Sequence, residues 1–179
     1  MLLHPECLQK LRAEIDSTLD EQDVVAPYEK VQHLDYLRAC LNESLRLNPP
    51  VSHNLPRATP PEGAFIDGEW IAGNTTVSMS AYIAHRDPKI FAEPEKFIPD
   101  RWLGEAGKDL GPYFVAFTAG ARSCIGRNIS YLEQTVLIAS LLHRYDFELE
   151  TPDFQPTRYE TMSLSLGPIP TRLRFRKGR

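Results

Sequence analysis

The residues best suited to chemistry lie in one short stretch, Phe117–Gly126, which reads FTAGARSCIG. Cys124 stands just before a predicted helix, where the positive end of the helix dipole and free backbone N–H groups favour a thiolate. Arg122 adds a positive charge two residues earlier. Gly120 and Gly126 permit turns and let a bulky, flat partner approach the backbone. The stretch therefore predicts a ligand-binding or reactive cysteine.

Three roles remain open for Cys124 at this point. A tetrahedral metal site is disfavoured, because the three cysteines and five histidines show no ligand spacing. An axial thiolate ligand to haem iron needs only one cysteine, which fits. The alternatives are a buried core cysteine in a glycine-bounded loop and a cysteine nucleophile with a histidine base.

The pattern F-x-x-G-x-R-x-C-x-G resembles the haem-binding signature of the cytochrome P450 monooxygenases. It is matched at Phe117, Gly120, Arg122, Cys124 and Gly126. The resemblance implies that the Cys124 thiolate is the proximal ligand of haem b, and that its electron donation favours O–O cleavage. It also implies that Arg122 contacts a haem propionate and that Phe117 packs beneath the haem near the sulfur.

A second motif, Glu43-Ser-Leu-Arg46, lies on a predicted helix, and its i, i+3 spacing puts both charges on one face. Alone, such a pair is usually a solvated surface pair that contributes under ~1 kcal/mol. It resembles the E-x-x-R motif of the same family, which is paired with a downstream arginine, here Arg101 in Pro99-Asp-Arg101-Trp102. We expect a structural triad in which both arginines share the Glu43 carboxylate.

Other assignments come from the same resemblance. Arg57 resembles a basic residue that binds a propionate, with a surface arginine as the alternative, and bidentate recognition of carboxylate suits arginine. His85 is expected to be a satisfied structural histidine in a turn. Two segments are predicted to face substrate, although an apolar residue there is more often core: Val51, Ser52, His53 and Asn54, and Met162, Ser163 and Leu164.

The elements that must position these residues follow from apolar spacing. One helix is predicted through Leu8, Leu11, Ile15 and Leu19, and a second through Leu34, Leu37, Leu41 and Leu45, ended by Pro49-Pro50. A third follows Gly126, with Ile129, Leu132, Val136 and Ala139 on one face and Leu137 and Leu141 beside it. A hairpin is predicted at residues 65–71 with an Asp67-Gly68 turn, followed by a strand at 75–79 and a short helix at 81–85. Residues 88–112 show no stable period. Further strands are predicted at 147–149, 162–166 and 173–175.

The fold class is therefore α+β and mainly helical. The resemblance implies the C-terminal portion of the cytochrome P450 fold: the E-x-x-R helix, short β-strands, a meander, the cysteine-ligand loop and a long helix after it. It covers residues 1–179, and we expect the family's N-terminal anchor and distal oxygen-activating helix to be absent from them.

Composition limits the function classes. With 42% hydrophobic and 25% charged residues and a net charge of −4, the chain is neither typical of disorder nor globally suited to nucleic acid. Most of its 15 prolines lie between Pro49 and Pro112, so that stretch is not mostly helix. No apolar run approaches the ~20 residues of a membrane span, and the start lacks a signal-peptide pattern.

The resemblance implies a monooxygenase that uses O2 to insert oxygen into a small organic substrate, with an aromatic substrate suggested by similarity to fungal members. Electrons would come from NADPH through NADPH–cytochrome P450 reductase. The alternative is a catalytically inactive truncated fragment, at most a haem-binding or interaction module; a haem-thiolate peroxygenase is a third option. The expected location is the cytosolic face of the endoplasmic reticulum membrane for a full-length eukaryotic member, or the soluble cytoplasm for this anchorless chain.

Overall fold

The structure is a computed structural model that describes residues 1–152, 154–161 and 163–176. Its helices are α1 (Pro5–Asp16), α2 (Tyr28–Val31), α3 (Asp35–Leu47), α4 (Ala81–Ala84), α5 (Gly104–Leu110) and α6 (Arg127–Arg144). Short 3-10 turns form η1 (Pro99–Trp102), η2 (Gly111–Tyr113) and η3 (Gly120–Arg122). The strands are β1 (Arg57–Ala58), β2 (Ala64–Ile66), β3 (Glu69–Ile71), β4 (Thr76–Val77), β5 (Tyr145–Leu149), β6 (Arg158–Glu160), β7 (Leu164–Leu166) and β8 (Thr171–Phe175).

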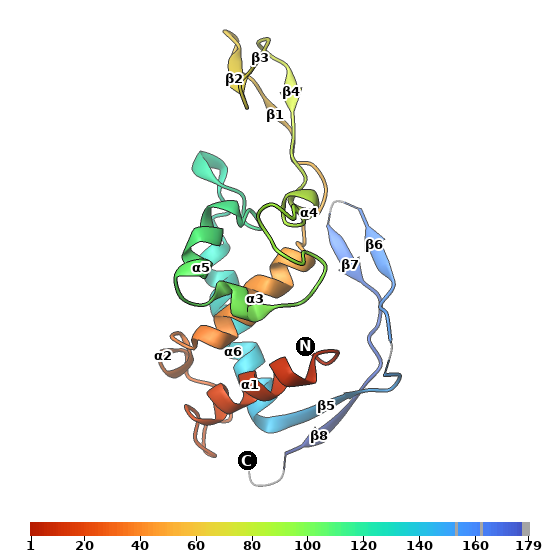
Figure 1. Ribbon diagram of the computed structural model, residues 1–179. Coiled ribbons are helices and arrows are strands. Elements are labelled where there is room, and N and C mark those ends of the chain that lie inside the picture. Colours follow the sequence, from red (N-terminus) through yellow and green to blue (C-terminus); the bar gives the residue numbers. More distant parts are fainter. Residues whose placement is uncertain (153, 162, 177–179) are drawn as a thin grey trace.

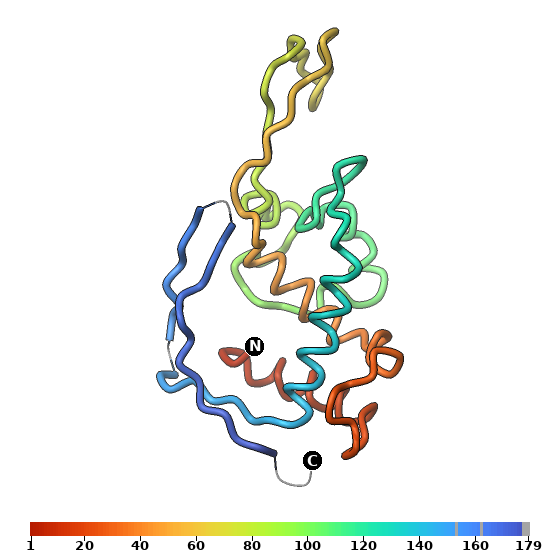
Figure 2. The backbone as a smooth tube through the Cα atoms, turned by 180° about the vertical axis from the view of Figure 1, so that it is seen from behind, coloured from red at the N-terminus to blue at the C-terminus, as the bar shows by residue number. Residues whose placement is uncertain are grey.

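The strands form antiparallel pairs beside a helical body. β1 pairs with β4, β2 with β3, β5 with β8, and β6 with β7. Figures 1 and 2 show β1–β4 and β2–β3 projecting from one end of the helices, while β5–β8 and β6–β7 run along their side. The predicted α+β, mainly helical class is confirmed, and within the described ranges no helix is long and apolar enough to span a membrane.

The core lies where α1, α3 and α6 pack together. Leu11 and Ile15 of α1 and Leu37 of α3 are fully buried there, as the predicted spacing requires, and Cys40 of α3 is buried beside them. α3 ends at Leu47, directly before Asn48 and the two prolines that cannot continue a helix.

The N-terminus of α3 is capped from another helix. Leu34, at the capping position, offers no side-chain oxygen. The Glu14 carboxylate of α1 instead accepts the backbone N–H groups of Tyr36 and Leu37, each at 2.8 Å. These bonds satisfy amides that a helix start leaves unpaired, and the negative charge suits the positive end of the dipole. They fix how α1 crosses α3.

The predicted buried face of α6 is wrong except for Ala139. The helix buries Tyr131, Thr135, Ala139 and Leu142, whereas Ile129, Leu132 and Leu137 are exposed. The reason is that α6 is apolar on more than one side, so its periodicity does not select the face that meets α1, α2 and α3.

Between residues 57 and 112 the predicted hairpin is present as β2–β3 and the predicted short helix as α4, whereas α5 was not predicted. Asp67 and Gly68 both have positive φ, 51° and 83°, as a two-residue hairpin turn requires. α5 formed where no periodicity predicted it. Its seven residues carry no apolar stripe, and it packs on η1 so closely that a Cβ on Gly107 would lie 2.1 Å from the Trp102 carbonyl oxygen.

Candidate functional site

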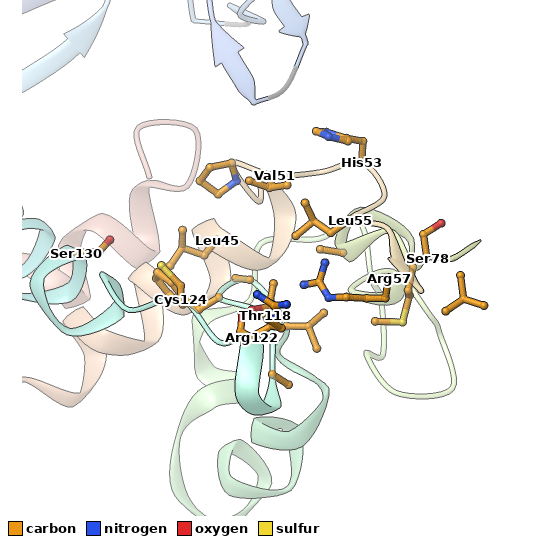
Figure 3. A pocket seen from close by; sticks show the side chains of 18 of the residues that line it. Leu45, Val51, His53, Leu55, Arg57, Ser78, Thr118, Arg122, Cys124 and Ser130 are labelled. Carbon is orange, nitrogen blue, oxygen red and sulfur yellow. Dashed lines mark hydrogen bonds between the residues drawn. The ribbon is translucent and has the colours of Figure 1, made fainter. Parts of the chain in front are cut away.

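A cavity of about 810 Å³ opens between the end of α3, the strands after it and the loop before α6. Figure 3 shows Cys124, Arg122 and Arg57 among the side chains that line it. Most of its other walls are apolar, and no aspartate or glutamate of the described chain lines it. Its volume lies within the ~300–1,000 Å³ typical of small-molecule and cofactor sites.

The loop that carries Cys124 is held by its own backbone. The Cys124 N–H donates to the Phe117 carbonyl at 2.8 Å, and the Thr118 hydroxyl donates to the Arg122 carbonyl at 2.6 Å. Gly120 has a φ of +68°, a left-handed conformation that glycine adopts without strain. These contacts close the loop and leave the Cys124 thiol exposed.

Cys124 is exposed, so the interpretation of it as a buried core cysteine is wrong. Within the described residues, no hydrogen bond joins its thiol to a histidine, as a Cys–His catalytic pair would need. A Cβ on Gly126 would lie 3.7 Å from the Cys124 sulfur, an ordinary van der Waals distance, so this glycine sits directly beside the thiol.

Two cations reach the same cavity from separate segments. Arg57 lies on β1 and Arg122 in η3, and both also line an adjoining recess of about 420 Å³. Among the ion pairs of the described chain, neither guanidinium has a carboxylate partner. Two unpaired guanidiniums beside an apolar hollow suit a ligand that is flat, apolar and carries carboxylates.

A fully buried ion pair lies behind this cavity, in α3. The Glu43 carboxylate receives Arg46 Nε at 2.8 Å and Nη2 at 2.9 Å, and both side chains have no exposed surface. Arg46 also donates to the backbone carbonyls of His85, Pro94 and Lys96 at 2.7–3.0 Å. Every arm of this guanidinium is therefore satisfied without water.

The same carboxylate holds the segment that follows. Arg101 Nε lies 3.2 Å from Glu43 Oε1, so the structure brings the predicted triad together. The Ile98 N–H and the Trp102 indole N–H also donate to Glu43, at 2.8 and 2.9 Å, and neither contact was predicted. Burial by itself would raise the pKa of Glu43, but the hydrogen bonds from Arg46, Ile98 and Trp102 and the Arg46 charge lower it.

His85 connects this buried cluster to the loop before Cys124. Its Nε2 accepts the Val115 N–H at 2.9 Å, so Nδ1, 3.2 Å from the Arg46 carbonyl oxygen, carries the proton. The ring stacks on Phe114, with centroids 5.4 Å apart. Burial lowers the pKa of His85 to about 4, so the ring is neutral near pH 7. It is the satisfied structural histidine that the sequence predicts.

A family model described as cytochrome P450 matches residues 1–175. The chain belongs to the cytochrome P450 family. Cytochrome P450 monooxygenase penB of Penicillium thymicola is 41% identical over 150 residues, which cover 83% of this chain and 34% of that relative. Cytochrome P450 monooxygenase atr2 of Stereocaulon alpinum is 41% identical over 155 residues, 86% of this chain and 30% of the relative.

Solved structures agree on the fold. The crystal structure of the cytochrome P450DA haem domain matches with a TM-score of 0.86 and 25% identity, covering 97% of this chain and 38% of that one. The predicted P450 fold is thereby confirmed. The chain spans about a third of the length of the curated relatives named here.

The P450 family implies haem, and the residues around this cavity fit it. Haem is flat and apolar, binds a thiolate through its iron and carries two carboxylates. The cavity offers the exposed Cys124 thiol, two guanidiniums without carboxylate partners and mostly apolar walls. Phe117, Arg122, Cys124 and Arg57, all predicted to bind cofactor, line it together, while Gly120 and Gly126 shape the loop without lining it.

The residues predicted to face substrate divide into two groups. Val51 and His53 line the cavity, but Ser52 and Asn54 do not. The chain bends at Val51 and at His53, so the four residues do not share one face. Ser52 is buried against the Glu160 carboxylate.

In the second predicted segment, Ser163 and Leu164 do not line the cavity. The Leu164 N–H donates to the Pro50 carbonyl at 2.6 Å, so this segment supports the wall from behind. Met162 lies outside the described residues. The sequence also missed Ser130 and Gln134 of α6, which line the cavity and are hydrogen-bonded at 2.7 Å. Their i, i+4 spacing beside the cysteine motif was the available signal.

Replacing Glu43 with glutamine should cost about 3–5 kcal/mol of folding free energy, because it leaves two largely buried guanidiniums without a countercharge. Denaturant unfolding of the variant and the parent chain measures this loss. Glu95→Gln is the matched control, since Glu95 pairs with Arg86 at 3.0 Å but has a side chain 71% exposed. Equal losses in the two variants would contradict the structural role of Glu43.

Acidification should weaken the fold through His85. Its pKa falls from an ordinary 6.5 to about 4 in the folded chain, so the unfolded chain binds the extra proton between these values. The stability that the neutral His85 contributes is therefore fully present above pH 6.5. It is lost as the pH drops towards about 4, by at most about 3 kcal/mol. The pKa of Glu43 is also lowered, so its stabilising contribution is lost only when the pH falls below its ordinary value of 4.5.

Unfolding free energies measured across this pH range check the effect. His85→Gln cannot titrate, so its stability should fall less steeply with acid than that of the parent chain. Identical pH slopes in the parent and the variant would contradict a neutral, buried His85.

Proposed function

We propose that the chain is the C-terminal portion of a cytochrome P450 haem domain and contributes the thiolate side of a monooxygenase site. The observation that carries this proposal is the exposed Cys124 thiol in a cavity whose charged lining is Arg57 and Arg122. Family membership and the printed names of the relatives, which are monooxygenases, support it.

In this proposal the chain's residues hold haem b in three ways. Cys124 would supply a thiolate to the iron, Arg57 and Arg122 would bind the propionates, and Phe117 would pack against the ring. When bound, the haem supplies the activation of O2 for insertion of one oxygen atom into a substrate. Arginine suits the propionates because its planar fork matches carboxylate geometry.

Backbone hydrogen bonds hold the loop that carries Cys124 in one conformation. The Cys124 N–H is already committed to the Phe117 carbonyl, and the closed turn through Gly120 fixes where the sulfur points. Apolar wall residues, among them Leu45, Val51 and Leu55, line the cavity beside the thiol. Such walls exclude water and strengthen electrostatic contacts inside the site.

For the whole protein we propose a small organic substrate, aromatic in the favoured case, and electrons from NADPH through NADPH–cytochrome P450 reductase. The fungal sources of the relatives support the comparison with fungal members. We also propose the cytosolic face of the endoplasmic reticulum membrane as the site of action.

A spectrum of the haem-loaded chain tests the thiolate. The reduced, carbon-monoxide difference spectrum should show the red-shifted Soret band of a thiolate-bound haem, because the thiolate donates electrons to the iron. Cys124→Ala should lose this band. Cys7→Ala, which removes a thiol that is 8% exposed and lies in α1, should retain it. Persistence of the band in Cys124→Ala would overturn the assignment.

Haem binding without turnover is the second candidate for the isolated chain. The observation that favours it is that the chain spans 34% and 30% of two monooxygenase relatives. The haem-loaded chain supplied with reductase, NADPH and benzoate should then release no hydroxylated product above a control with free haem. Hydroxylated product above that control would contradict this second candidate and would show that the chain alone supports turnover.

A further inference from the structure

The wall segment that carries Val51 and His53 is held from behind by the hairpin β6–β7. Three contacts join them over long sequence separations. Arg158 Nη2 donates to Asn48 Oδ1 at 3.1 Å, the Leu164 N–H donates to the Pro50 carbonyl, and the Ser52 hydroxyl donates to Glu160. No described residue of the hairpin lines the cavity.

Ser52 is the point where this support converges. It is 2% exposed, and its hydroxyl reaches Glu160. Its carbonyl accepts the Ser80 hydroxyl at 2.6 Å and the Tyr82 N–H at 3.4 Å. A buried hydroxyl that loses its acceptor pays a desolvation penalty, so this residue is strongly held in one orientation.

The two neighbours of Ser52 face the opposite way. Val51 and His53 both line the cavity, and Figure 3 shows them along one wall, across from Arg122. Ser52 lies between these two residues in the chain and is buried away from the cavity, so its hydrogen bonds hold the backbone from which both neighbours reach the cavity. Whatever fixes Ser52 therefore fixes the shape of this wall.

We propose that Glu160 is a positioning residue that, through the buried Ser52 hydroxyl, sets the placement of Val51 and His53 and with it the size of ligand the cavity accepts. This proposal rests on the proposed function only in taking the cavity as the ligand site. The Leu164–Pro50 bond uses backbone atoms alone, so removing the Glu160 side chain leaves the hairpin attached.

Two variants test the contact from its two sides. Glu160→Ala removes the acceptor and Ser52→Ala removes the donor, while Glu160→Gln keeps an acceptor oxygen. Glu150→Ala is the matched control, because Glu150 lies just beyond β5 and meets Arg172 only at 3.9 Å. Amide chemical shifts and hydrogen exchange report the placement of the wall in the chain without haem.

Apart from the amides next to each substituted residue, we expect Glu160→Ala and Ser52→Ala to shift the same amides, those of residues 51–55 and 80–82, and to speed their exchange about tenfold. Glu160→Gln should restore the parent pattern, and Glu150→Ala should not disturb it. Unchanged amides in this segment, or changes of the same size throughout the core, would overturn the positioning role.

Ligand selectivity is the second readout. In the haem-loaded chain, the ratio of dissociation constants for imidazole and 4-phenylimidazole, followed by the Soret shift, should change at least fivefold in Glu160→Ala and return in Glu160→Gln. A loaded variant with an unchanged ratio would overturn the proposal. Failure of the parent chain to take up haem would instead contradict the proposed function, and the amide readout would still decide the role of Glu160.

Discussion

The structure depends most on one buried charge, the carboxylate of Glu43. A carboxylate with no exposed surface is costly unless every lone pair is used. Here two guanidiniums, a backbone N–H and an indole N–H meet it from two parts of the chain, α3 itself and residues 98–102. Arg46 then extends the network to three backbone carbonyls of the region after α4. Helix α3 is thus bonded to a proline-rich segment that has little regular structure of its own.

This network sets the position of the cysteine loop. The Trp102 indole donates to Glu43 and packs edge-on against Phe114. His85, hydrogen-bonded to Arg46, stacks on the same Phe114 and accepts the Val115 N–H. Cys124 lies nine residues beyond Val115, in a loop closed by the bond from its own N–H to the Phe117 carbonyl. The buried charge cluster around Glu43 is therefore connected to the Cys124 loop through the contacts of Trp102 and His85.

The sequence predicted what local motifs contain. Phe117, Arg122 and Cys124 lie within eight positions, so their shared cavity followed from one signature. The triad followed from two motifs, but the bond from the Trp102 indole to Glu43 was not predicted, although Trp102 stands in the second motif. The Glu14 cap and the Ser52–Glu160 contact join residues 22 and 108 positions apart, respectively, so only the folded chain reveals them. The face of α6 failed for a different reason, since that helix is apolar on more than one side.

Iron K-edge X-ray absorption of the haem-loaded chain tests most directly whether Cys124 binds the iron. We expect a sulfur atom in the first coordination shell of the parent chain, and only nitrogen or oxygen ligands in Cys124→Ala. A first shell without sulfur in the parent chain, or one that keeps its sulfur in Cys124→Ala, would contradict a haem held through this thiolate.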